Sequence, residues 1–122
     1  MIERSDYLSR RTKFEPSSIK LVIVAESPPA SGKYFYDPAG SVGEPLFKAL
    51  MLQIGFDPVT KDLGLQAFQQ HGWILVDASY EPVNELVEKA RDRTILRDYS
   101  LLSDDLAALL PDRSIPIILR NL

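Results

Sequence analysis

The sequence predicts an α/β fold, specifically a three-layer α/β/α sandwich with a mostly parallel central sheet. Two apolar runs, at residues 21–25 and 73–76, are each followed by an acidic residue and a polar loop. Apolar runs of this length bounded by turn formers are typical of strands that are covered on both faces, as in parallel sheets. Segments with apolar residues at helical spacing separate the two runs. This alternation indicates parallel strands joined by crossover helices.

Local patterns predict the other elements. Residues 7–18 are basic and polar, and we expect them to form a short irregular arm or helix before the first strand. Pro45 and Gly55 bound a helix over residues 45–54, since proline suits the first helical position and glycine the C-cap. The remaining elements that we expect are helices at residues 63–70, 83–91 and 94–110, and strands at residues 73–77 and 115–119.

Composition limits the class of protein. A chain of 122 residues fits a single domain over residues 1–122. The chain has no cysteine and a single histidine, His71, which excludes disulfides, thiolate chemistry and multi-histidine metal sites. We therefore expect no metal and no cofactor. No apolar run is long enough to span a bilayer, and the polar N-terminus does not resemble a signal peptide, so we expect a cytoplasmic protein with no membrane partner.

Charge and sheet size bear on partners. The net charge of −3 argues against bulk electrostatic binding of nucleic acid, which needs many cations near phosphates. A local basic face remains open, because basic residues gather in the first 33 positions. A sheet of three or four strands has exposed edges, which favour pairing with a second copy. Either a homo-oligomer forms through such an edge, or the domain is compact with its last strand at the edge.

Glu26 and Asp77 follow the two apolar runs at equivalent places. In open α/β sheets the ligand crevice lies beyond the carboxyl ends of the strands, so we expect both carboxylates to face one crevice as candidate catalytic residues. Paired acids can share acid–base work, and one can orient water toward a sugar carbon. In the alternative interpretation, each acid only caps a loop or a helix.

The loop after Glu26 supplies the candidate substrate-binding residues. Consecutive prolines make its start rigid, and three consecutive aromatic residues offer flat surfaces for a planar ring. We expect Phe35 at the edge of a pocket rather than within the core. An ordinary strand-to-loop corner whose aromatic residues cap the core is the alternative. The candidate substrate-binding residues are Ser27, Pro28, Lys33, Phe35, Tyr36 and Gly40.

Residues 25–29, Ala-Glu-Ser-Pro-Pro, and residues 32–40, Gly-Lys-Tyr-Phe-Tyr-Asp-Pro-Ala-Gly, resemble two motifs of the uracil-DNA glycosylase superfamily in its thermophile-type branch. The resemblance implies that Phe35 stacks on a base flipped out of DNA, and that Glu26 orients water. It also implies that Asp77 occupies the position of the asparagine that reads the base. The function implied is recognition of a DNA base, or its removal by an N-glycosidic hydrolase of DNA repair.

The chain departs from this family in three respects. It has no counterpart of the family's His-Pro motif, and it has no cysteine for the iron–sulfur cluster of the thermophile-type branch. Asp77 also replaces an amide, which removes a hydrogen-bond donor. The resemblance therefore implies a truncated or divergent member whose base removal is weak or absent. The alternative function is a non-catalytic α/β module that binds a small ligand or a protein.

Overall fold

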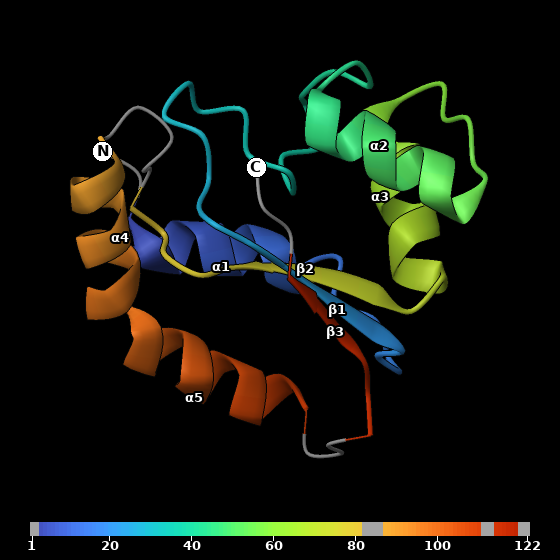
Figure 1. Cartoon of the computed structure of the whole chain (residues 1–122). Coiled ribbons are helices and arrows are strands. Elements are labelled where there is room, and N and C mark those ends of the chain that lie inside the picture. The colour runs from blue at the N-terminus through green and yellow to red at the C-terminus, as the bar shows by residue number, and fades with distance from the viewer. Residues whose placement is uncertain (1–2, 82–86, 111–113, 120–122) are drawn as a thin grey trace.

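The computed structural model of the chain describes residues 3–81, 87–110 and 114–119 (Figure 1). Three parallel strands form one sheet in the order β2-β1-β3. The elements in chain order are α1 (Arg4–Thr12), β1 (Leu21–Ala25), α2 (Pro45–Ile54), α3 (Lys61–Gln70), β2 (Trp73–Asp77), α4 (Glu88–Arg97), α5 (Tyr99–Leu109) and β3 (Ile117–Leu119). This architecture confirms the α/β prediction.

The central strand β1 is parallel to both of its neighbours. Val22 lies opposite Ile74 of β2 and opposite Ile117 of β3. The last four residues of β1 and of β2 are buried, as expected for strands covered on both faces. The prediction that β1 and β2 are adjacent and parallel is confirmed.

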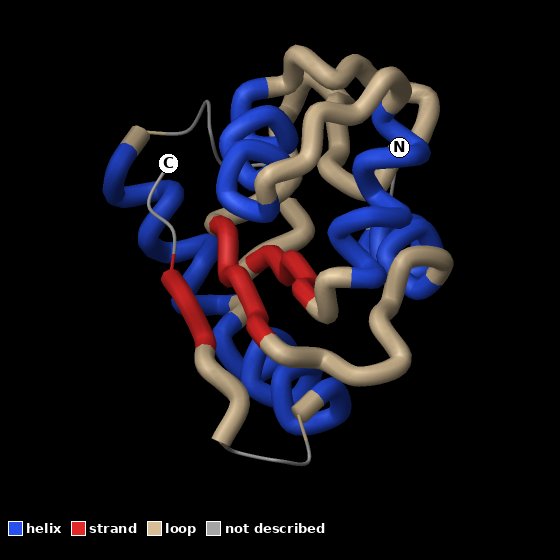
Figure 2. Tube along the Cα trace, turned by 90° about the vertical axis from the view of Figure 1, so that its right-hand side faces the viewer, coloured by secondary structure: helices blue, strands red, loops and turns tan. Residues whose placement is uncertain are grey.

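Helices surround this small sheet. Figure 1 shows α2 and α3 side by side, with α4 and α5 following each other along the opposite side of the molecule. Figure 2 shows the strands near the middle, with helices above and below them. This arrangement is compatible with the predicted three-layer sandwich. None of the helices among the described residues is long and apolar enough to cross a membrane.

The helix α2 has the bounds that the sequence predicts. Pro45 is its first residue, and Gly55 ends it in the left-handed conformation at φ 73°, where a side chain would be disfavoured. The helix α3 begins two residues earlier than predicted, because the Thr60 hydroxyl accepts the Leu63 N–H at 3.2 Å and caps the first turn. At the N-terminus α1 is a regular helix that ends at Thr12, and its start is closed by the Asp6 carboxylate, which accepts the Glu3 N–H at 2.9 Å.

The predicted helices at residues 83–91 and 94–110 have the wrong boundaries. The structure has α4 and α5 instead, which meet at Asp98, and residues 82–86 lie outside the described part. The Asp98 carboxylate accepts a hydrogen bond from the Ser79 hydroxyl at 2.6 Å. This contact with the loop after β2 accompanies the break between the two helices, and apolar periodicity does not register such a contact.

The strand β3 forms one edge of the sheet. Its residues Ile117, Ile118 and Leu119 are 45%, 50% and 79% exposed. The Pro116 carbonyl accepts the Val22 N–H at 3.1 Å and extends the pairing with β1 toward the predicted start at residue 115. The exposed edge agrees with the sequence analysis, and pairing with a second copy stays a prediction.

Candidate ligand-binding site

A cavity of about 290 Å³ lies at the carboxyl ends of β1 and β2, between the loop after β1 and the start of α2. We call it the strand-end cavity. Its apolar walls are formed by Pro28, Pro29, Tyr34, Phe35, Pro45, Leu46, Phe47 and Leu75. Its polar lining consists of Ser27, Ser31, Lys33, Glu44 and Asp77. Apolar walls with a few polar groups are typical of small-molecule sites.

The chain forms this cavity through two abrupt changes of direction. Pro28 and Pro29 cannot continue the β1 ladder, because proline lacks the N–H that the ladder needs. The chain then turns back, and Tyr34 and Phe35 are buried, with the Phe35 ring against those of Phe47 on α2 and Phe68 on α3. Pro45 next starts α2 beside the same loop. The cavity is the space left between the rigid loop and the helix start.

Asp77 is the distinctive polar group of the cavity. The residue is 3% exposed, and its Oδ2 is buried without a hydrogen-bond partner among the described residues. None of the ion pairs in the described part of the chain includes Asp77. Burial raises the pKa of the Asp77 carboxyl to about 7, although the charge of Arg11 acts in the opposite direction. Asp77 thus titrates near neutral pH.

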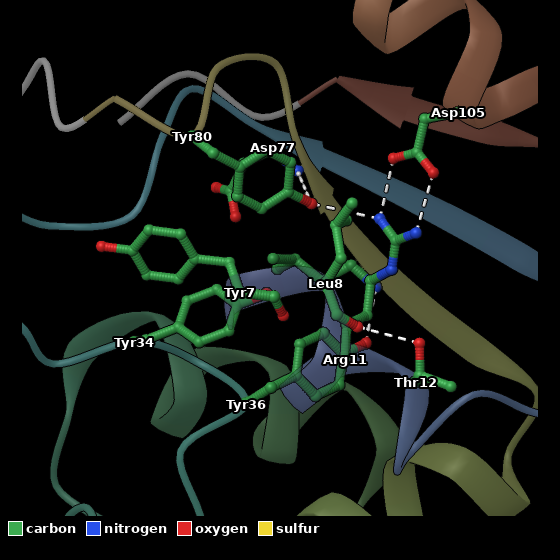
Figure 3. A network of polar contacts seen from close by, with 10 residues as sticks. Tyr7, Leu8, Arg11, Thr12, Tyr34, Tyr36, Asp77, Tyr80 and Asp105 are labelled. Carbon is green, nitrogen blue, oxygen red and sulfur yellow. Dashed lines mark hydrogen bonds and ion pairs between the residues drawn. The ribbon is translucent and has the colours of Figure 1, made fainter. Parts of the chain in front are cut away.

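Arg11 does not neutralise Asp77 directly, because its guanidinium is already engaged. It forms two hydrogen bonds of 2.8 Å with the Asp105 carboxylate and donates a third, of 3.1 Å, to the Tyr80 hydroxyl. The same hydroxyl accepts the Asp77 N–H at 3.3 Å. Figure 3 shows the Asp77 carboxylate on the far side of the Tyr80 ring from the guanidinium, with no dashed line to it. Arg11 therefore reaches Asp77 only through the Tyr80 hydroxyl, and none of the hydrogen bonds in the described part of the chain joins its guanidinium to the Asp77 carboxylate.

Neutral tyrosines surround this network (Figure 3). Burial raises the pKa of Tyr34 and Tyr36 well above the usual range, and it raises the pKa of Tyr80 to about 12. The Tyr34 hydroxyl donates to the Tyr7 carbonyl at 3.3 Å, and the two rings meet edge to face at 4.8 Å. These hydroxyls stay protonated at neutral pH, so they add no negative charge near Asp77.

A buried ion pair braces the opposite wall of the cavity. The Lys61 side chain is fully buried, and its ammonium donates to Glu44 Oε1 at 2.8 Å and to the Tyr34 carbonyl at 2.7 Å. Glu44 Oε2 accepts the Ser41 N–H at 2.8 Å. The carboxylate of Glu44 is therefore fully engaged, which leaves Asp77 as the carboxylate of the lining with a free buried oxygen.

The structure gathers five of the predicted site residues around the cavity. Asp77, Lys33 and Phe35 line it from β2 and the loop after β1, together with Ser27 and Pro28. Ser27 and Pro28 are buried, whereas Lys33 is exposed. The loop after β1 and the end of β2 thus meet at one site.

Glu26 is not among the described residues that line the strand-end cavity. Ala25, not Glu26, lies opposite Asp77 in the register of the two strands, and successive strand residues point to opposite faces. Glu26 Oε2 lies 4.0 Å from Arg91 Nη1 on α4. The structure therefore does not bring the two predicted acids together in this cavity.

Two other predicted binding residues have structural positions instead. Tyr36 is fully buried, and its hydroxyl accepts the Leu75 N–H at 2.8 Å inside the core. Gly40 lies in an exposed turn, where a Cβ would come within 2.2 Å of the Glu44 carboxylate. Gly40 therefore allows the close approach of the Lys61–Glu44 pair, and neither residue is among the described lining of the cavity.

Phe35 borders the cavity as expected, but it also belongs to the core, contrary to the sequence-based expectation. It is 5% exposed and contacts the rings of Tyr36 at 4.9 Å and Phe68 at 5.1 Å. We now expect Phe35→Ala to lower the free energy of unfolding by about 3–5 kcal/mol, the cost of truncating a buried phenylalanine. Urea denaturation tests this value, and a loss below about 1 kcal/mol would show that Phe35 is only a pocket-edge residue.

Sequence analysis missed Glu44, Lys61 and Arg11 as contributors to the site. Glu44 and Lys61 precede the helices predicted at residues 45–54 and 63–70, and charged residues at such positions are ordinarily solvated. Their pairing depends on how α2 and α3 pack, which the sequence pattern does not indicate. Within the described ranges, no group of three or more acidic or histidine side chains is placed to hold a metal ion.

Comparison of the chain with protein-family models, curated proteins and solved structures gives no match.

Proposed function

We propose that this chain binds a planar nitrogen heterocycle of the nucleobase class in the strand-end cavity, without cleaving it from its sugar. The observation that carries the proposal is the buried Asp77 Oδ2, which lacks a partner among the described residues. Its side chain lines the strand-end cavity and also a second cavity, of about 250 Å³, between the loop after β2 and α5. Buried polar atoms are nearly always hydrogen-bonded, and a buried atom without a partner calls for an explanation such as a ligand. A heterocyclic N–H would supply the missing hydrogen bond.

The shape and walls of the cavity support a ligand of this size and kind. Its volume of about 290 Å³ lies at the lower end of the range for small-molecule sites, which suits a single ring system. Phe35 and Tyr34 provide aromatic surface, and Pro28 and Pro29 provide rigid apolar surface. Stacking of a base on an aromatic ring contributes about 1–3 kcal/mol.

Recognition is favoured over base removal because of the position of Glu26. Removal needs a carboxylate that orients water at the sugar carbon, and Glu26 pairs with Arg91 at 4.0 Å rather than lining the cavity. DNA stays a proposed source of the base, as the sequence resemblance implies. The alternative, a protein-interaction module, makes no use of the free Asp77 oxygen.

Binding can be tested by recording amide NMR spectra of the chain during titration with guanosine, inosine, adenosine and uridine. The proposal predicts that at least one nucleoside shifts the resonances of residues 27–35, 44–47 and 75–77. Ser31→Trp would place a large side chain at an exposed position of the lining and should abolish these shifts. Ser9→Trp, at an exposed position on α1, is the matched control and should leave them unchanged. If none of the four nucleosides causes shifts, or if the shifts lie outside these residues and survive in Ser31→Trp, the proposal is contradicted.

We further expect the chain to show no efficient excision of uracil. A departing base carries negative charge, and a site in which the acceptor Asp77 stands where a donor is needed forgoes about 3–4 kcal/mol of stabilisation. Asp77 in its ionised form would repel that charge. The assay is incubation with uracil-containing single- and double-stranded oligonucleotides at low salt, followed by detection of abasic sites. Robust turnover that disappears in Glu26→Gln would show that this expectation is wrong.

A further inference from the structure

We infer that the strand-end cavity selects a guanine-type edge, in which two neighbouring N–H donors stand beside a carbonyl oxygen, and that it discriminates against uracil-type edges. The inference rests on the proposed function and names the ligand class of the same cavity. It depends on which hydrogen-bonding groups line the cavity and on which of them are already engaged.

Asp77 is the acceptor group of the cavity. An ionised carboxylate accepts hydrogen bonds and donates none, so it pairs best with a fork of two parallel N–H groups. Asp77 has a buried oxygen without a partner in the described part of the chain, and the Arg11 guanidinium that could have filled this role is held by Asp105 and Tyr80. The N1–H and 2-amino groups of guanine form such a fork.

The other charged groups of the described lining are Glu44 and Lys33. The Glu44 carboxylate is engaged by Lys61 at 2.8 Å and by the Ser41 N–H at 2.8 Å, so it does not compete for the ligand. Lys33 is exposed and lines the same cavity. A lysine ammonium is a suitable donor to the guanine carbonyl oxygen and ring nitrogen. The lining therefore offers an acceptor group and a cation, which matches a donor pair beside a carbonyl.

A uracil-type edge does not fit these groups. Uracil presents a carbonyl on each side of its single ring N–H, so an ionised Asp77 would face a carbonyl oxygen with no proton between them. A site built around a hydrogen-bonding group discriminates strongly against a ligand that leaves that group unpaired. Asparagine at position 77 would instead offer one donor and one acceptor, as a lactam edge requires.

The experiment is a calorimetric titration of guanosine, inosine and uridine into the wild-type chain, Asp77→Asn and Asp104→Asn. Inosine is the matched ligand, because it differs from guanosine only by the absent 2-amino group. We run it at about pH 8.5, above the pKa of Asp77 of about 7. The inference predicts that guanosine binds the wild type about tenfold or more tightly than inosine, with uridine weakest. Asp77→Asn should lose this preference, whereas Asp104→Asn, at an exposed position on α5, should retain it.

Three outcomes would decide against the inference. If inosine or uridine binds the wild type as tightly as guanosine, the selectivity is wrong while binding of heterocycles stands. If Asp77→Asn keeps the preference for guanosine, Asp77 is not the selecting group. If none of the nucleosides binds, the proposed function fails together with the inference.

Discussion

Asp77→Asn should raise the free energy of unfolding at about pH 8 by roughly 4 kcal/mol, because the wild type keeps a buried carboxylate there without a compensating partner. The amide has nearly the same shape as the carboxylate and carries no charge. Few single substitutions stabilise a protein by this amount, so the effect would be easy to recognise.

The direction in which stability changes with pH follows from proton binding by the folded and the unfolded chain. The pKa of Asp77 is raised from an ordinary value of 3.8 to about 7 in the folded chain, chiefly by burial. Between these values the folded state binds more protons than the unfolded state, so stability falls as pH rises, by up to about 1.4 kcal/mol per pH unit. The stability associated with protonated Asp77 is fully present below 3.8, the pKa of the group in the unfolded chain, and is lost as pH passes through about 7.

Chemical denaturation of the wild type, Asp77→Asn and the exposed control Asp104→Asn, at pH values from about 4 to about 8, measures this difference. The curve of Asp77→Asn should diverge from that of the wild type as pH rises, while the curve of Asp104→Asn stays parallel to it. A constant offset between Asp77→Asn and the wild type would show that Asp77 titrates with an ordinary pKa.

Glu44→Ala should lower the free energy of unfolding by about 3–5 kcal/mol, since it leaves the buried Lys61 ammonium without its counter-ion. The Lys61 side chain is fully buried, and only the Tyr34 carbonyl, at 2.7 Å, would remain among its described acceptors. The loss of the Ser41 N–H contact with Glu44 adds to the cost. Because the pair braces the start of α2, we also expect Glu44→Ala to weaken ligand binding.

A double-mutant cycle with Lys61→Met separates the loss of the ion pair from the loss of side-chain packing. Methionine fills similar space without charge, so Glu44→Ala in the Lys61→Met background should cost about 1 kcal/mol or less. An equal cost of Glu44→Ala in both backgrounds would mean that the ion pair contributes nothing, and that Glu44 acts only through its helix-end contact with Ser41.

Local sequence patterns were sufficient to predict two strands and one complete helix of the fold. The apolar runs gave β1 and β2 and their adjacency, and Pro45 with Gly55 gave both ends of α2, because these residues act through their own backbone geometry. The break at Asp98 was missed because it coincides with a hydrogen bond from Ser79, which is 19 residues away in sequence.

The site could be predicted only in part, for the same reason. The position of the cavity and the roles of Lys33 and Asp77 in its lining follow from where strands end. Glu26 stands one residue beyond Ala25, the partner of Asp77, so the two acids take opposite faces although each directly follows an apolar run. Tyr36 resembles its aromatic neighbours in sequence, yet its hydroxyl satisfies the Leu75 N–H in the core. Lys61 and Glu44 meet only through the packing of α2 and α3.

NMR titration of the Asp77 side-chain carbon, without and with saturating guanosine, shows whether Asp77 is a buried carboxyl group that binds a ligand. We expect a pKa of about 7 for Asp77 in the free chain and a clearly lower pKa with guanosine bound, since donor N–H groups stabilise the ionised form. A pKa near its ordinary value of 3.8 in the free chain, or a pKa that guanosine leaves unchanged, would show that Asp77 does not have this role.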